Sequence, residues 1–144
     1  PDDVKLHNES VQKISIVAIL VSKAEIIYRK NNESDEWIDI LEQAIKLEGE
    51  LAYDEPPAWM IPVRQTLVAL LLESRMNTHY SKILTYIKED LTKWPDNIWS
   101  LSALSRYANT YPVGDDTLLQ TLEKLKGSMG TSCACALTHW KSEE

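Results

Sequence analysis

Hydrophobic residues recur every three or four positions through most of this chain, the spacing that places side chains on one face of an α-helix. Six helical segments follow from this pattern, at about 10–30, 34–51, 62–76, 78–94, 97–108 and 115–126. No stretch shows a competing strand pattern, because the β-branched run at 15–21 lies inside a longer helical periodicity. The sequence therefore predicts an all-α fold of about three antiparallel helix pairs.

Residues that favour helix ends mark the predicted boundaries. Ser34 and Thr78 can accept hydrogen bonds from free backbone N–H groups at a helix start. Pro62 suits a first helical turn, because the N–H that proline lacks has no partner there. Pro95 stops the fourth helix, and Gly127 is the expected end of the sixth.

The apolar face of each segment defines the predicted core. The first helix is expected to bury Ile16 and Tyr28, and the fourth to bury a regular stripe from Tyr80 to Trp94. Trp37 is expected in the core with Trp94. The sixth helix is expected to turn four leucines inward, namely Leu118, Leu119, Leu122 and Leu125.

The segment YDEPPAWMIPVR separates the first helix pair from the second. Its consecutive prolines exclude a helix, so it reads as a rigid linker in which Asp54 and Glu55 stay hydrated and Trp59 fixes the linker onto the helices. We expect a single domain over 1–144, with hairpins at 10–51, 60–95 and 96–127, a linker at 52–61 and an irregular tail at 128–144.

The helix pairs share a repeated spacing of large and small residues. In the second pair, Leu67, Leu70, Ile83, Ile87 and Pro95 match the spacing of a 34-residue tetratricopeptide repeat. Corresponding positions in the other pairs are Val21, Ala24, Tyr28, Leu41 and Ala44, and then Leu101, Leu104 and Ala108. The pattern predicts a short right-handed solenoid of stacked helix pairs.

Two motifs carry a more specific resemblance. DEPPAWMIPVR at 54–64 and KEDLTKWPDNIWSL at 88–101 resemble the C-terminal part of a family of larger, poorly characterised tetratricopeptide-repeat proteins, many of them bacterial. The resemblance covers most of 33–107. It implies that this chain can be the tail of a longer solenoid, and it supplies no reaction.

The inner surface of such a solenoid comes mainly from the first helix of each pair, and three arginines from three pairs would converge there. The planar guanidinium of arginine suits carboxylates, and Trp99 can stack on a ligand, so an extended acidic peptide is a plausible partner. The simpler alternative is that these arginines are solvated or pair with Asp and Glu on adjacent helices. The candidate ligand-binding residues are Arg29, Gln65, Arg75, Trp99, Arg106 and Asn109, flanked by Ile26, Lys30, Val68, Leu72 and Ser102.

Cys133, Cys135 and His139 form the one compact set of soft metal ligands in the sequence. A C-x-C spacing lacks the turn geometry of zinc knuckles, and no second Cys pair completes a site. We therefore expect small buried thiols, with no metal and no other cofactor.

Composition narrows the function classes. The formal charge of -7 disfavours a general nucleic-acid binder, and 44% hydrophobic residues suffice for a core. The densest apolar run is too short to span a membrane, and no signal peptide is visible, so a soluble, cytoplasmic protein is the default expectation. No nucleophile–base or glycine-rich phosphate motif is present, so no catalytic residue is assigned.

Three functions remain open. The first is a protein- or peptide-binding module that uses the concave face of the solenoid. The second is a non-catalytic C-terminal domain of a larger enzyme, with a metal-dependent enzyme as one case. The third, a direct enzymatic role, is disfavoured for this chain alone.

Overall fold

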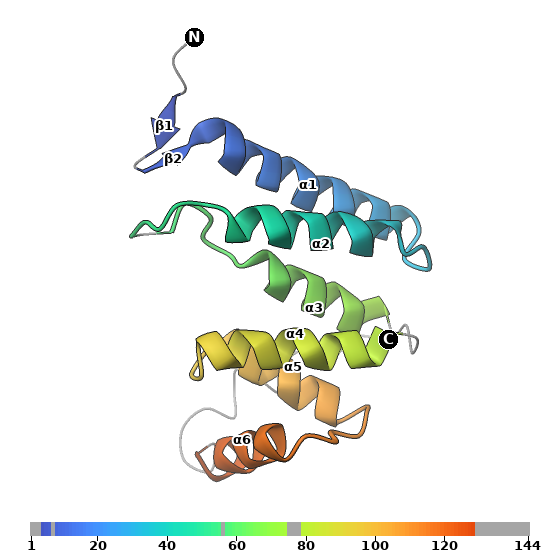
Figure 1. Cartoon of the computed structure of the whole chain (residues 1–144). Coiled ribbons are helices and arrows are strands. Elements are labelled where there is room, and N and C mark those ends of the chain that lie inside the picture. Colours follow the sequence, from blue (N-terminus) through green and yellow to red (C-terminus); the bar gives the residue numbers. More distant parts are fainter. Residues whose placement is uncertain (1–3, 7, 56, 75–78, 129–144) are drawn as a thin grey trace. The chain divides into compact units, whose positions relative to one another are not determined.

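The computed structural model describes residues 4–6, 8–55, 57–74 and 79–128 and shows a mostly helical chain. The prediction of an all-α fold is confirmed, with the addition of a two-stranded antiparallel hairpin before the first helix (Figure 1). In the described residues the elements are β1 (Lys5–Leu6), β2 (Glu9–Ser10), α1 (Val11–Lys30), α2 (Glu36–Gly49), α3 (Val63–Ser74), α4 (Tyr80–Lys93), α5 (Ile98–Ala108) and α6 (Asp116–Ser128).

The chain divides into two compact units, residues 1–77 and residues 78–144. Unit 1 holds the hairpin and α1 to α3, and unit 2 holds α4 to α6. Within each unit, helices that follow one another in the sequence pack together. The boundary falls inside the predicted 60–95 hairpin, and the solenoid of three stacked pairs stays a prediction.

The core of unit 1 is built around α2, which lies between α1 and α3 (Figure 1). Trp37 on α2 is fully buried, and its ring meets Tyr28 of α1 edge to face at 5.1 Å between centroids. Because α2 has a neighbour on both sides, its buried stripe is broad and includes both Ile38 and Leu41. The predicted burial of Trp37 and Tyr28 is confirmed.

Two carboxylates fix the connection between α2 and α3. Glu9 of β2, which is 3% exposed, accepts hydrogen bonds from the backbone N–H of Ala52 at 2.6 Å and of Ser10 at 2.7 Å. Glu48 near the end of α2 accepts from the N–H of Val63 at 3.1 Å. Since backbone donors at turns and helix starts need partners, these contacts hold both ends of the predicted linker.

Asn8 adds a further contact to this connection. Its backbone N–H donates to Asp54 Oδ2 at 3.2 Å, so Asp54 is a hydrogen-bond acceptor for the β1–β2 turn. The side chain of Asn8 also donates to the carbonyl of Tyr53 at 3.4 Å. The half-exposed Asp54 carboxylate therefore also holds the β1–β2 turn, a role that the sequence analysis did not predict.

The core of unit 2 comes from one face of each of its helices. Ile83 and Ile87 of α4 are 1% exposed, Leu104 of α5 is fully buried, and Leu118 and Leu122 of α6 are buried. Two polar residues share this interior, because the Ser100 hydroxyl donates to the buried carboxylate of Asp90. This pair ties the end of α4 to the start of α5.

Several core predictions are wrong at the margins of the helices. Ile16 is 41% exposed and Leu119 is 40% exposed, since both lie at the edge of their helix's apolar stripe. Trp94 is also 41% exposed and lies under the ammonium group of Lys93, 4.2 Å from the ring centroid. Val68, expected on the ligand-facing surface, is 4% exposed and belongs to the core.

The helix-start predictions are confirmed where the structure describes them. The Ser34 hydroxyl accepts from the N–H of Glu36 at 3.2 Å, as expected. At the start of α5 the structure adds Asn97, which accepts from the N–H groups of Trp99 and Ser100. Thr78 lies outside the described residues. The sixth helix runs past Gly127 to Ser128, so the predicted stop at Gly127 is wrong. None of the described helices is long and apolar enough to cross a membrane.

Candidate functional site

Unit 2 exposes one stripe of α5 that contains three of the predicted ligand-binding residues. Trp99 is 71% exposed, and Arg106 and Asn109 are exposed as well. Spacings of seven and three residues place these side chains on one face of the helix, opposite the buried Leu104. The stripe combines an aromatic surface, a guanidinium and an amide, which together can contact an extended peptide.

Arg29 and Arg106 have different surroundings. In unit 1, Arg29 on α1 forms an ion pair with Glu73 on α3 at 2.8 Å, and its guanidinium carbon lies 5.2 Å from the ring centroid of Tyr28. In unit 2, no residue that the structure describes forms an ion pair with Arg106. The alternative of pairing with an acidic residue of another helix therefore holds for Arg29, whereas Arg106 has no ion-pair partner among the described residues.

The other two candidates add little to a site. Gln65 is half-buried on α3 of unit 1, and Arg75 lies outside the described residues. The convergence of three arginines on one groove stays a prediction.

A cleft of about 450 Å³ opens in unit 2 beside α4, and the sequence analysis did not identify it. One wall is a single face of α4, and the other is formed by Tyr107 of α5 and the connection from α5 to α6. The volume lies in the range of small-ligand pockets. The lining residues are Tyr80, Ser81, Leu84, Thr85, Lys88, Tyr107, Pro112, Gly114 and Asp115.

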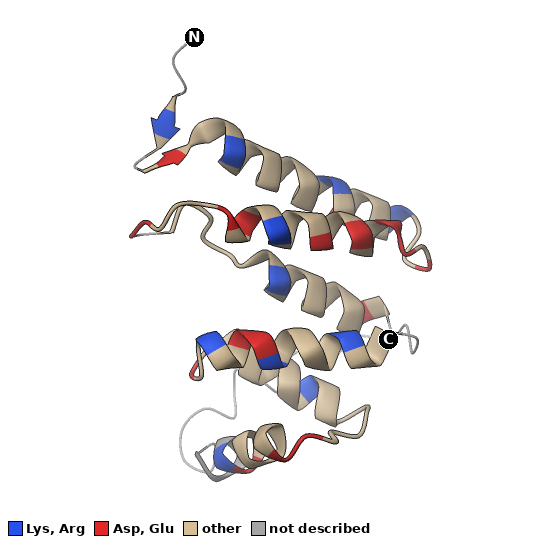
Figure 2. Ribbon diagram, viewed as in Figure 1, with Lys and Arg blue, Asp and Glu red and all other residues tan. Residues whose placement is uncertain are grey.

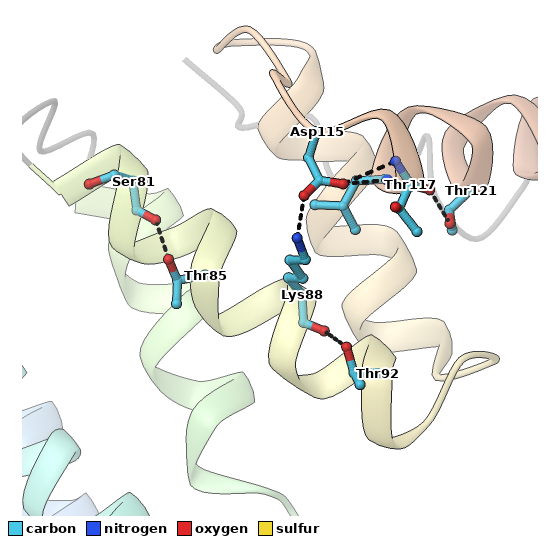
Figure 3. Close-up of polar contacts among 8 residues, drawn as sticks. Ser81, Thr85, Lys88, Thr92, Asp115, Thr117 and Thr121 are labelled. Atoms are coloured by element: carbon cyan, nitrogen blue, oxygen red, sulfur yellow. Dashed lines mark hydrogen bonds and ion pairs between the residues drawn. The ribbon is translucent and has the colours of Figure 1, made fainter.

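An ion pair closes one side of this cleft. Figure 3 shows Lys88 on α4 pointing at Asp115, and the Lys88 ammonium group donates to Asp115 Oδ2. The second carboxylate oxygen caps α6, accepting from the N–H groups of Thr117 at 3.0 Å and Leu118 at 3.2 Å. These donors, with Lys88 foremost, hold the pKa of Asp115 below its ordinary value. Both oxygens of Asp115 are therefore already occupied.

Three tyrosines form a cluster at the cleft. The rings of Tyr80 and Tyr111 stack at 6.0 Å between centroids, and those of Tyr107 and Tyr111 lie at 5.2 Å. Tyr107 is 1% exposed, and this burial raises the pKa of its phenol. Of the three rings, Tyr80 is 48% exposed and provides the aromatic surface that a ligand in the cleft can reach.

Hydroxyl groups on α4 differ in whether their protons are available. The Thr85 hydroxyl donates to the carbonyl of Ser81 at 3.0 Å, and Thr92 donates to the carbonyl of Lys88 at 2.8 Å (Figure 3). Such bonds to the preceding turn use up the hydroxyl proton. The side-chain hydroxyls of Tyr80 and Ser81, in contrast, have no partner among the described residues.

The candidate metal ligands Cys133, Cys135 and His139 lie outside the described residues. Within 4–6, 8–55, 57–74 and 79–128, no three His, Cys, Asp or Glu side chains come close enough to hold a metal ion. No assembly of nucleophile and base is visible at the cleft, where the polar groups are hydroxyls and one ion pair.

No protein-family model, curated protein or solved structure matches the chain.

Proposed function

We propose that this chain is an interaction module of the tetratricopeptide-repeat type, which binds an acidic peptide or protein segment along the exposed stripe of α5. The observation that carries the proposal is Trp99, a large aromatic residue that is 71% exposed on the same helix face as Arg106. Exposed Trp and Arg residues are the types most often found at the energetic centre of protein interfaces.

The charge balance favours an acidic ligand at unit 2 and disfavours one at unit 1. Residues 1–77 contain 8 Lys and Arg against 14 Asp and Glu, a formal charge of -6. Residues 78–144 contain 7 against 8, a formal charge of -1. An acidic segment therefore meets less repulsion at unit 2, where Arg106 provides donors suited to a carboxylate.

The test is binding of a fluorescein-labelled peptide library enriched in Asp and Glu, measured by anisotropy. We expect Trp99→Ala to lower the affinity for the selected peptides by about tenfold or more, as is typical for residues at the centre of an interface. Arg106→Glu should abolish their binding. Trp94→Ala is the matched control, because Trp94 is a partly exposed tryptophan of the same unit that lies off the α5 stripe.

Thermal unfolding of each variant separates a lost contact from a lost fold. Trp99 and Arg106 are exposed, so their substitution should leave the Tm unchanged. Undiminished peptide binding by both variants would exclude the α5 stripe as the site.

A second function has its own supporting observation. Ile16, Ile19 and Ile26 are 41%, 64% and 55% exposed and lie on one face of α1 in unit 1. An apolar stripe of this kind can pack against a further helix of a larger protein, as a non-catalytic terminal domain would require.

Hydrogen exchange tests this second function. The chain is compared with an extended version that includes any preceding segment that its gene encodes. Slower exchange of the α1 amides in the longer protein supports the terminal-domain role, and unchanged exchange rules it out.

A further inference from the structure

Two hydroxyls and one ammonium group can donate hydrogen bonds into the cleft of unit 2, whereas its one carboxylate is already engaged at both oxygens. The hydroxyls of Tyr80 and Ser81 have no described partner, and the Lys88 ammonium group has three N–H donors of which Asp115 takes one. Asp115, the one carboxylate in the lining, accepts at both oxygens already. A complementary ligand is therefore rich in carbonyl oxygens and poor in N–H groups.

The apolar part of the lining favours flat or ring-shaped groups. Tyr80 and Tyr107 flank the cleft, and Tyr111 packs against both rings and holds them in place. Leu84 and Pro112 complete the apolar surface. Aromatic-lined grooves of this type bind the pyrrolidine rings of proline-rich segments in other domains.

The charge of the lining is balanced. Lys88 is its one cation, and Asp115 neutralises it at hydrogen-bond distance. An acidic peptide would gain no net attraction here, which separates this cleft from the α5 stripe, where Arg106 has no ion pair with any residue that the structure describes. A neutral ligand is the better match.

The length of the donor row matches an extended peptide. From Tyr80 to Lys88 the lining follows one face of α4 for eight residues, which is about 12 Å at about 1.5 Å per residue. A polyproline II helix rises about 3.1 Å per residue, so about four residues span this distance. Its carbonyls have no internal hydrogen bonds, and each proline lacks an N–H group.

We propose that the cleft between α4 and the α5–α6 connection binds a proline-rich segment in the polyproline II conformation. The rings of the ligand pack on the exposed ring of Tyr80 and on Leu84 and Pro112, and its carbonyls accept from Tyr80, Ser81 and Lys88. This site uses a different surface and a different ligand chemistry from the α5 stripe, so either one can fail without the other.

The test uses the full chain and a fluorescein-labelled peptide of six prolines, with a glycine–serine peptide of equal length as comparison. We expect saturable binding of the proline peptide with a Kd below about 1 mM, and no saturation by the glycine–serine peptide. Amide chemical shifts should change in 80–88 and 107–115. Absence of saturable proline binding, equal binding of both peptides, or shifts confined to other regions would overturn the proposal.

Two glycines provide a matched pair of variants. A Cβ added at Gly114, which lines the cleft, or at Gly49, at the end of α2, meets no atom within 4 Å. Both leucine variants should therefore fold. Gly114→Leu places a side chain at the cleft and should weaken proline-peptide binding about tenfold or more, whereas Gly49→Leu should not change it. Equal affinities of the two variants would contradict the assigned site.

A third variant tests the donors without altering the shape of the cleft. Tyr80→Phe keeps the ring and removes the hydroxyl, so we expect binding to weaken roughly three- to tenfold, as for the loss of one hydrogen bond. Trp99→Ala should leave proline-peptide binding unchanged. Full affinity in Tyr80→Phe would exclude the proposed contact, and a loss in Trp99→Ala would place the peptide on the α5 stripe.

Discussion

Charged side chains hold the connections between helices in both units, but the exposed arginines Arg29 of unit 1 and Arg106 of unit 2 differ in their surroundings. Glu9 and Glu48 satisfy backbone N–H groups at the two ends of the α2–α3 connection, and Arg29 is paired with Glu73. In unit 2, Trp99 and Arg106 are exposed without a described polar partner for the guanidinium.

Figure 2 shows the same contrast in the distribution of charge, with acidic residues along α2 and in the connections at both of its ends. The formal charges of -6 for residues 1–77 and -1 for residues 78–144 follow this pattern. A charged residue therefore points to a ligand-binding role only when its partners within the protein are known. Arg29 and Arg106 were both candidates for the ligand-binding surface, and they differ in surroundings.

The largest expected effects test whether both units have equally well-packed cores. Leu41 in unit 1 and Leu104 in unit 2 are both fully buried. We expect Leu41→Ala and Leu104→Ala each to lower the free energy of unfolding by about 2–5 kcal/mol, measured by urea denaturation. Ile19→Ala, at an exposed position, is the control and should change it by less than about 0.5 kcal/mol. A loss below about 1 kcal/mol in only one unit would show that its core is loosely packed.

The next effect concerns the buried polar pair of unit 2. Ser100→Ala removes the hydroxyl that donates to the buried Asp90 carboxylate, and we expect a loss of about 1–3 kcal/mol in the free energy of unfolding. Thr92→Ala, which removes an exposed hydroxyl bonded to its own helix, serves as control and should be close to neutral. If both substitutions changed the free energy of unfolding equally, the Asp90 carboxylate would accept a hydrogen bond from another donor once Ser100 is replaced.

Acid titration compares one carboxylate from each unit. Backbone hydrogen bonds from Ala52 and Ser10, with a smaller contribution from Lys13, lower the pKa of Glu9 from its ordinary 4.5. Because the pKa of Glu9 is lower in the folded than in the unfolded protein, the ionised carboxylate stabilises the fold above pH 4.5. This stabilisation is lost as the pH falls through the pKa that Glu9 has in the folded protein. Asp115 in unit 2 behaves in the same way below its ordinary pKa of 3.8.

We therefore expect Glu9→Gln to lower the urea midpoint at pH 6, and the difference from the unsubstituted protein to shrink as the pH falls below 4.5. For Asp115→Asn the corresponding difference should shrink below 3.8. Glu55→Gln is the control, because Glu55 is an exposed carboxylate of the same connection. A difference that does not depend on pH would mean that the charge of Glu9 is irrelevant to its hydrogen bonds.

The smallest effect addresses the two arginines directly. A double-mutant cycle on Arg29 and Glu73 should give a coupling of about 0.2–1 kcal/mol, because both side chains are largely exposed. Arg106→Ala should not alter the free energy of unfolding, and it should weaken the binding of acidic peptides. A stability loss in Arg106→Ala larger than that in Arg29→Ala would reverse the roles assigned to the two residues.

Much of the helical structure could be read from the sequence, because local patterns specify it. The apolar spacing predicted all six helices, and Ser34 and Asn97 accept the N–H groups expected of cap residues. The errors lie at the edges of apolar stripes. Ile16 and Trp94 have the spacing of core residues, yet the spacing of a helix does not say how far a neighbouring helix covers its face.

The candidate sites were predictable only in part. The spacing of Trp99, Arg106 and Asn109 on one helix face follows from periodicity, and their exposure in the structure agrees with a surface role. The cleft could not be found in this way, because Lys88 on α4 meets Asp115 across 27 residues of sequence. A weak signal exists in the polar residues of α4 that share a face, but a solvent-exposed helix face has the same pattern.

The sequence by itself determined the helices of this protein, their ends and the balance of charge between its two halves. Backbone bonds four residues apart and capping side chains specify a helix locally. Only the tertiary structure decided that Glu9 meets Ala52 across 43 residues, that Arg29 is paired with Glu73 while Arg106 has no ion pair with a described residue, and that a cleft opens beside α4. These contacts depend on how elements far apart in the chain pack together, and residue spacing within one helix carries no information about that packing.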